Sequence, residues 1–131
     1  MGLINNNKMP LTFNSRDEHN QRINNALQRL MALTLVPGGW DDDAVNEQLK
    51  PFLLKIDELA ALPTAAFVSF IARYKVDPDN LELLADALVN LSQKAGYEVL
   101  AGHAVGVYEH IQQSGDVFSL TVAGKLKALR S

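Results

Sequence analysis

YEVLAGHAVGVYEHIQQS, residues 97–114, predicts one helix that carries apolar residues on two sides. The first stripe is of ordinary core type and consists of Tyr97, Leu100, Ala101, Ala104, Tyr108 and Ile111. The second stripe mixes small, branched and imidazole side chains and consists of Val99, Gly102, His103, Gly106, Val107 and His110. A helix with two such stripes is expected to pack against neighbours on both sides.

Two glycines lie one turn apart in the second stripe, Gly102 and Gly106. Each costs about 1 kcal/mol relative to alanine in a helix interior, so a close contact is expected to offset roughly 2 kcal/mol. Glycines at i and i+4 let another element approach the helix closely. Three neighbours remain open for this face: a helix of the same chain at residues 63–75 or 119–130, a second copy in a homodimer, or a small molecule in a groove.

The histidines of this helix do not form a predicted metal site. His103 and His110 are seven residues apart, about 10 Å along the helix axis, whereas pairs that share an ion are three or four residues apart. Tyr108, Glu109 and His110 are consecutive and therefore point in different directions. We expect no catalytic, cofactor-binding or metal-binding residue in the chain, and no cofactor.

Five further helical segments are predicted around this helix, which gives an all-α, compact bundle of about five or six antiparallel helices. They start at the Ser15 cap, at the capping carboxylates Asp41–Asp43, at Pro63, at Asp79 and at the Ser119 cap. The first of them carries one apolar stripe, Ile23, Ala26, Leu27, Leu30, Met31 and Thr34, and residues 117–122 also fit a short strand. The second helix is expected to kink or restart at Lys50-Pro51, and the helix at 63–75, apolar nearly all round, is expected to be buried. Residues 1–13 are predicted to be a flexible tail and residues 14–131 a single domain.

The hairpin at residues 79–114 resembles a tetratricopeptide-type unit over about a quarter of the chain. The residues that carry the resemblance are Leu81, Leu84, Ala85 and Leu88 in its first helix and Ala101 and Ala104 in its second. Tyr97 departs from the pattern, since such units favour a small residue there, and no second copy follows at the same period. The resemblance implies a way of packing two helices.

The composition excludes several classes of function. The chain has 131 residues, a formal net charge of −3 and no cysteine. An acidic protein has no general attraction to nucleic acid or to anionic membranes, so neither is an expected partner. Without a basic segment and an apolar run at the N-terminus we expect no signal peptide, and a cytoplasmic location.

These observations favour a non-enzymatic interaction or structural module that binds a protein partner or itself. Its candidate contact face is the second stripe of residues 97–114, and Trp40 is a candidate anchor. A buried Trp40 would fix the first interhelical loop, whereas an exposed one would bind a partner. Two alternatives remain: a DNA-binding regulator, because residues 112–130 resemble a helix-turn-helix, and a small-molecule-binding bundle with its groove beside Gly102 and Gly106.

Overall fold

The computed structural model describes residues 8–130, with side chains from Asp17 onward. Over this range the chain forms seven α-helices and one 3₁₀ turn, and no strand. The elements are α1 (Lys8–Leu33), α2 (Asp42–Leu49), η1 (Lys50–Phe52), α3 (Ile56–Ala61), α4 (Thr64–Arg73), α5 (Pro78–Leu91), α6 (Leu100–Ser114) and α7 (Leu120–Arg130). The predicted all-α class is confirmed. The alternative strand at residues 117–122 is wrong, because α7 begins at Leu120.

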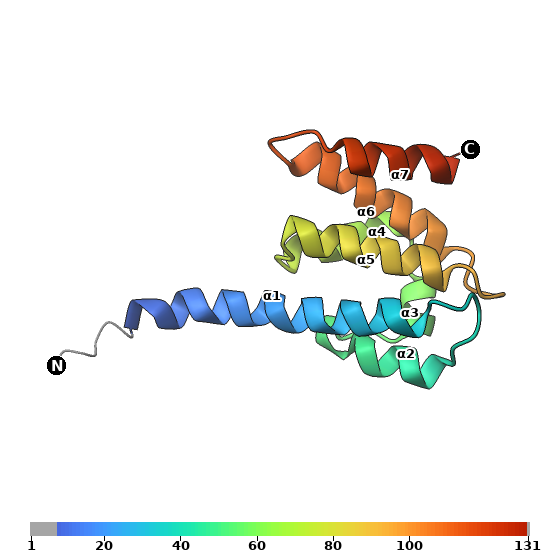
Figure 1. Ribbon diagram of the computed structural model, residues 1–131, viewed down its shortest axis with the longest axis horizontal. Helices are drawn as coiled ribbons and strands as arrows, with labels where there is room; N and C mark the ends of the chain where they lie inside the picture. Colours follow the sequence, from blue (N-terminus) through green and yellow to red (C-terminus); the bar gives the residue numbers. More distant parts are fainter. Residues whose placement is uncertain (1–7, 131) are drawn as a thin grey trace.

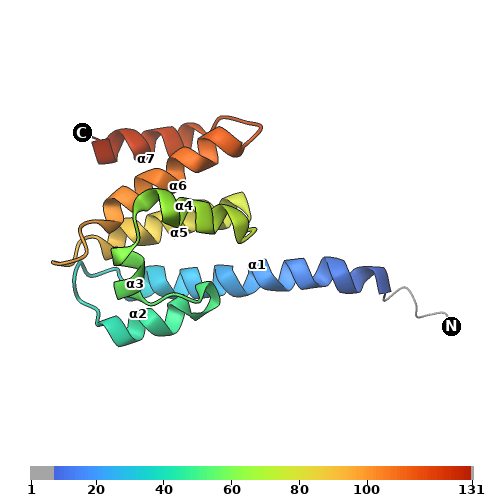
Figure 2. The same cartoon turned by 180° about the vertical axis from the view of Figure 1, so that it is seen from behind.

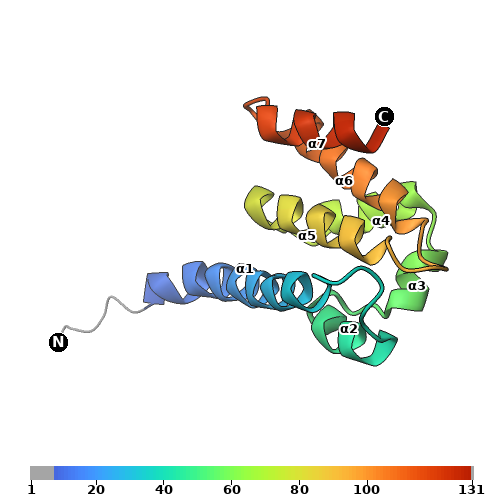
Figure 3. The ribbon, with the colours of Figure 1, turned by 45° about the vertical axis from the view of Figure 1, so that its right-hand side comes forward.

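The helices form a stacked bundle in which α1 and α2 run in opposite directions, as do successive helices from α4 to α7 (Figure 1). α1, α5 and α7 run the same way and follow one another across the molecule, while α6 crosses between α5 and α7. From behind, α4 lies in front of α5 and next to α6 (Figure 2). The oblique view in Figure 3 separates α1, α5 and α7 and places α2 and α3 at one end of the stack. α7 is therefore the terminal helix at the other end.

α1 confirms its predicted apolar stripe but not its predicted start. Ile23, Ala26, Leu27 and Leu30 are buried. The helix begins at Lys8, so Ser15 lies inside it and does not cap it. The Ser15 prediction is wrong because the helix continues upstream of the cap-like sequence. Residues 1–7 of the predicted tail lie outside the described residues.

The break at Lys50-Pro51 is present and is larger than a kink. α2 ends at Leu49, η1 follows, and the helix restarts only at Ile56, which raises the number of α-helices above the predicted five or six. The inward face continues across the break through Val45, Leu49, Phe52, Ile56 and Leu59, all of them buried. Leu53 leaves this face, because its φ of 61° ends η1 and turns its side chain outward, 78% exposed.

The expected burial of the helix at 63–75 on all sides is wrong. Only Phe67 and Ile71 of α4 are buried, and Ala65 and Ala66 are exposed. α4 lies on the outside of the stack, where α6 is its main neighbour (Figure 2). One neighbouring helix can cover only one side of α4, so α4 has more apolar side chains than the fold buries.

The cap of the last helix is confirmed. The Val122 amide donates to Ser119 Oγ at 3.1 Å, as expected for a serine at the N-cap. Val122 and Leu126 are the buried residues of α7, whereas Leu120 is 81% exposed. The inward face of α7 is therefore narrow.

Candidate functional site

The second stripe of residues 97–114 lies partly against α4 and partly in solvent. α6 starts at Leu100 and not at Tyr97, so Val99 belongs to the preceding turn, where it is 48% exposed. His103 and Val107 are buried, Gly106 and His110 are half-buried, and Gly102 is exposed. The stripe is thus not one uniform face, since its middle lies inside the protein and its ends reach the surface.

At Gly106 the side chains of α4 lie very close to the backbone of α6. A Cβ at this position would lie 2.8 Å from Cγ2 of Thr64 and 2.8 Å from Cγ2 of Val68. Both neighbours are short β-branched side chains with little freedom to move away. At Gly102 a Cβ would be 3.7 Å from Thr64 Oγ1, an ordinary contact. Of the three neighbours considered for the glycines, a helix of the same chain accounts for Gly106.

Alanine at the two glycines is expected to change stability in opposite directions. Gly106→Ala should lower the free energy of unfolding by about 1–2 kcal/mol, because overpacking against Thr64 and Val68 outweighs the gain in helix propensity. Gly102→Ala, the matched control, should raise it by up to about 1 kcal/mol, because no close neighbour opposes the gain. Urea unfolding followed by circular dichroism measures both values. A Gly106→Ala variant more stable than the wild type would contradict the close contact.

His103 is a fully hydrogen-bonded core residue. Its Nε2 lies 3.0 Å from the Leu59 carbonyl oxygen and its Nδ1 lies 2.9 Å from Thr64 Oγ1. The carbonyl can only accept, so Nε2 carries the proton and Nδ1 accepts from the hydroxyl of Thr64. The ring also stacks on Phe67 with the centroids 5.2 Å apart. His103 thereby joins α6 to α3 and α4, and both of its nitrogens are occupied.

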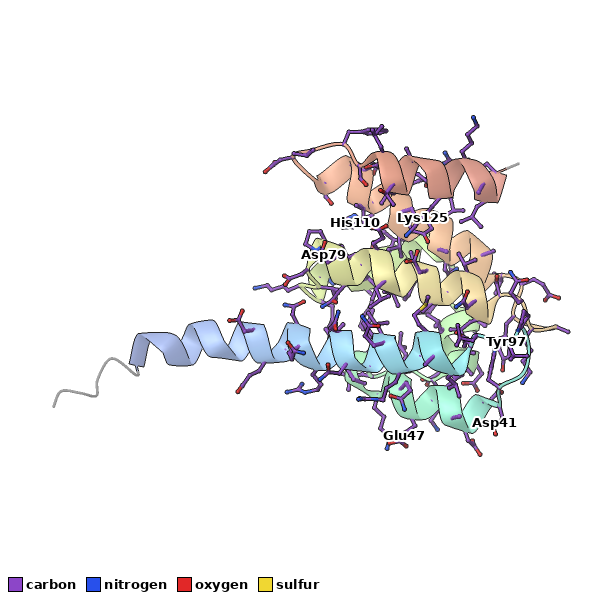
Figure 4. The ribbon with its side chains drawn as sticks, viewed as in Figure 1. Asp41, Glu47, Asp79, Tyr97, His110 and Lys125 are labelled. Carbon is purple, nitrogen blue, oxygen red and sulfur yellow. The ribbon has the colours of Figure 1, made fainter. Side chains whose placement is uncertain are left out.

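His110 lies seven residues further along α6, where it is half-buried (Figure 4). Within the part of the chain that the structure describes, no three His, Asp or Glu side chains are grouped so that they could hold a metal ion.

Trp40 is part of the core and does not form a surface anchor, since its side chain is 5% exposed. Lys94 Nζ lies 4.4 Å above the indole ring and donates to the Trp40 carbonyl oxygen at 2.7 Å. Tyr97 packs on the same ring at a centroid distance of 5.7 Å. Trp40 therefore ties the α1–α2 loop to the α5–α6 loop.

The acidic run after Trp40 acts as a helix cap, as predicted. Asp41 Oδ1 accepts from the Ala44 amide at 2.8 Å, and Asp41 lies at the start of α2 (Figure 4). Asp42 accepts from the Tyr97 hydroxyl at 2.6 Å. This hydrogen bond, together with burial and the charge of Asp42, raises the pKa of Tyr97 to about 12. Asp41 and Asp42 therefore make their hydrogen bonds at the same end of the molecule as Trp40.

A charged cluster between α5 and α7 was not predicted. Lys125 Nζ lies 2.6 Å from Glu82 and 3.0 Å from Asp86, and the Tyr108 hydroxyl donates to Asp86. Burial lowers the pKa of Lys125, but the hydrogen bonds to Glu82 and Asp86 outweigh it and leave this pKa raised. Burial and the hydrogen bond to Asp86 raise the pKa of Tyr108. Lys125 lies between α5 and α7 (Figure 4) and bridges them as a cation at neutral pH.

A second unpredicted feature is the turn between α6 and α7, which presents large apolar side chains to solvent. Val117, Phe118 and Leu120 are 81%, 63% and 81% exposed. Gln112 fixes the turn, because its Nε2 donates to the Ser119 carbonyl at 2.8 Å and its Oε1 accepts from the Ser119 amide at 2.9 Å. The three apolar side chains thus extend from a backbone held by paired hydrogen bonds.

A groove of about 550 Å³ lies beside this turn, on the outer side of the α6–α7 pair. We call it the α6–α7 outer groove, and its lining residues are Glu109, Gln112, Gln113, Phe118, Ala123, Leu126, Lys127 and Arg130. Arg130 and Glu109 form an ion pair across it. The sequence carried one indication of this surface: Val117 and Phe118 follow a helix end and precede a cap, where core residues are rarely found.

Comparisons with known proteins give no relative from which a role could be transferred. A scan against protein-family models, a search of curated proteins and a search of solved structures each find no match. Among the described residues, no helix has the length and apolar character needed to cross a membrane.

Proposed function

We propose that this protein is a helical interaction module that associates with a second copy of itself through the α6–α7 outer groove. The observation that carries the proposal is Phe118, which is 63% exposed at the edge of the groove on a turn fixed by Gln112. The proposal concerns binding and assigns no reaction to the chain.

The turn has the properties of a preformed contact. An exposed apolar cluster is characteristic of an interaction surface when several large side chains lie together. Val117, Phe118 and Leu120 occur within four residues, and aromatic side chains are enriched in the centre of interfaces. Because Gln112 and Ser119 hold the backbone, less conformational entropy is lost on binding than for a free loop.

A second copy fits the groove because the groove is self-complementary. In a two-fold dimer the same surface of each copy faces its mate, so the surface must offer both partners of every contact. The groove has apolar side chains in Phe118, Ala123 and Leu126 and both signs of charge in Glu109, Lys127 and Arg130. A strongly acidic or basic groove would instead repel its own copy.

The alternative interpretations have less support. A helix-turn-helix at residues 112–130 would read DNA with α7, but Lys125 and Arg130 pair with carboxylates of the same chain. A groove beside Gly106 is filled by Thr64 and Val68. The resemblance of α5 and α6 to a tetratricopeptide-type hairpin agrees with an interaction module, because such hairpins pack side by side and leave a face for partners.

Sedimentation velocity over a range of protein concentrations tests the proposal. The wild type is expected to dimerise, and Phe118→Ser should weaken dimerisation by at least about tenfold, the effect of losing one interface anchor. Leu53→Ser is the matched control, since Leu53 is 78% exposed at the other end of the stack and should leave dimerisation unchanged. Circular dichroism checks that both variants are folded. A wild type that stays monomeric at the highest concentration, or equal dimerisation of Phe118→Ser, would overturn the proposal.

A further inference from the structure

A second groove runs between α5 and α7, on the side of α7 away from the α6–α7 outer groove. We call it the α5–α7 groove. It consists of a section of about 380 Å³ near the start of α5 and a section of about 320 Å³ near its end, and the Lys125 bridge to Glu82 and Asp86 lies between them. Ile111 of α6 and Val122 of α7 line the section near the start of α5. Tyr108 of α6 and Leu129 of α7 line the section near its end.

The charge of the α5–α7 groove is strongly negative. Asp79, Glu82 and Asp86 follow one another along one side of α5, and Asp116 lies at the entrance. Lys125 is the single cationic residue in the lining of either section. Four carboxylates and one ammonium give the groove a net charge of −3, which is as large as the formal net charge of the whole chain, and Lys125 is paired with Glu82 and Asp86. Figure 4 shows Asp79 and Lys125 at two points along the groove.

Most of the other lining residues are apolar, and the uncharged polar ones are Asn90, Tyr108, Ser114 and Ser119. The section near the end of α5 has four apolar lining residues, Met31, Val89, Ala128 and Leu129. Asp79 and Asn90, which line the two different sections, are about 17 Å apart along α5, the length of roughly three helical turns. A small ion would use the carboxylates and leave the apolar walls uncovered, whereas an amphipathic segment would cover both.

We propose that the α5–α7 groove binds a basic amphipathic segment of a partner protein, with lysine or arginine side chains on the carboxylates and apolar side chains on the α7 wall. Complementary charge selects such a segment and disfavours acidic ones, because like charges across an interface cost affinity. The apolar face of an amphipathic helix seats in a groove by a widely used mode of peptide recognition. This site shares Val117 and Ser119 with the turn beside the α6–α7 outer groove, but its carboxylates do not line that groove, so peptide binding and self-association are measured independently.

Fluorescence anisotropy with a labelled helical peptide of lysine and leucine, about three turns long, tests this inference at low salt. A peptide of the same length with glutamate for lysine is the ligand control. The protein variant is Asp79→Asn/Asp116→Asn, because both residues are exposed and their replacement does not threaten the core. The control variant is Asp43→Asn/Glu47→Gln on α2, which removes the same charge from another surface.

The lysine peptide is expected to bind the wild type, and the glutamate peptide is not. Affinity should fall about tenfold in Asp79→Asn/Asp116→Asn and change by less than about twofold in the control variant. Three outcomes would overturn the inference: no binding of the lysine peptide, equal losses in both variants, or complete displacement of the peptide by spermine at equal charge concentration. The last would mean that the groove takes small cations. None of these outcomes bears on dimerisation, which is measured separately.

Discussion

His103→Ala is expected to lower the free energy of unfolding by about 3–4 kcal/mol, among the largest effects of any single substitution in this chain. The substitution removes a fully buried ring that stacks on Phe67 and leaves a cavity. It also leaves the Leu59 carbonyl and the Thr64 hydroxyl without their partner, and an unsatisfied buried polar group costs about 1–3 kcal/mol.

Urea unfolding followed by circular dichroism measures the effect. His110→Ala is the control, because His110 belongs to the same helix and is only half-buried, and a loss below about 1 kcal/mol is expected there. Equal losses for the two histidines would mean that the hydrogen bonds to Leu59 and Thr64 contribute little to stability.

The second large effect is expected at Trp40. Trp40→Ala should cost about 3–5 kcal/mol, because the indole is buried and contacts Lys94 and Tyr97. Trp40→Phe keeps an aromatic ring in the core and should cost about 1–2 kcal/mol. The smaller ring also lacks the indole Nε1, a buried donor without a hydrogen-bond partner in the wild type, so this change removes an unsatisfied group.

Trp40 is the one tryptophan of the chain, so its own fluorescence cannot follow unfolding of the variants and circular dichroism is required. A Trp40→Ala variant within about 1 kcal/mol of the wild type would mean that the two loops are held by other contacts. A Trp40→Phe variant as unstable as Trp40→Ala would assign the effect to the shape of the indole and not to burial of an aromatic ring.

Elements whose position depends on local sequence could be predicted. The apolar stripe of α1, the Ser119 cap and the break at Pro51 depend on side chains a few residues apart. The Ser15 cap failed because a capping sequence is also compatible with a helix interior. The burial of α4 failed because composition gives the apolar area that a helix offers and not the number of neighbours that cover it.

The candidate surfaces could be predicted less well, because they depend on residues far apart in the chain. The sequence identified the second stripe of α6, but Thr64 and Val68, which fill the space at Gly106, come from a helix about 40 positions upstream. Lys125 meets Glu82 and Asp86 across a similar separation. Residue spacing within one helix carries no information about such pairs until the order of the helices in space is known.

The joining of two loops by Trp40, Lys94 and Tyr97 also limits how this fold can vary in length. Surface loops between helices usually accept insertions, because few contacts depend on their path. In this protein the α1–α2 loop and the α5–α6 loop meet at one end of the stack, since Lys94 binds both the ring and the carbonyl of Trp40. An insertion in either loop would displace a core residue held by the other.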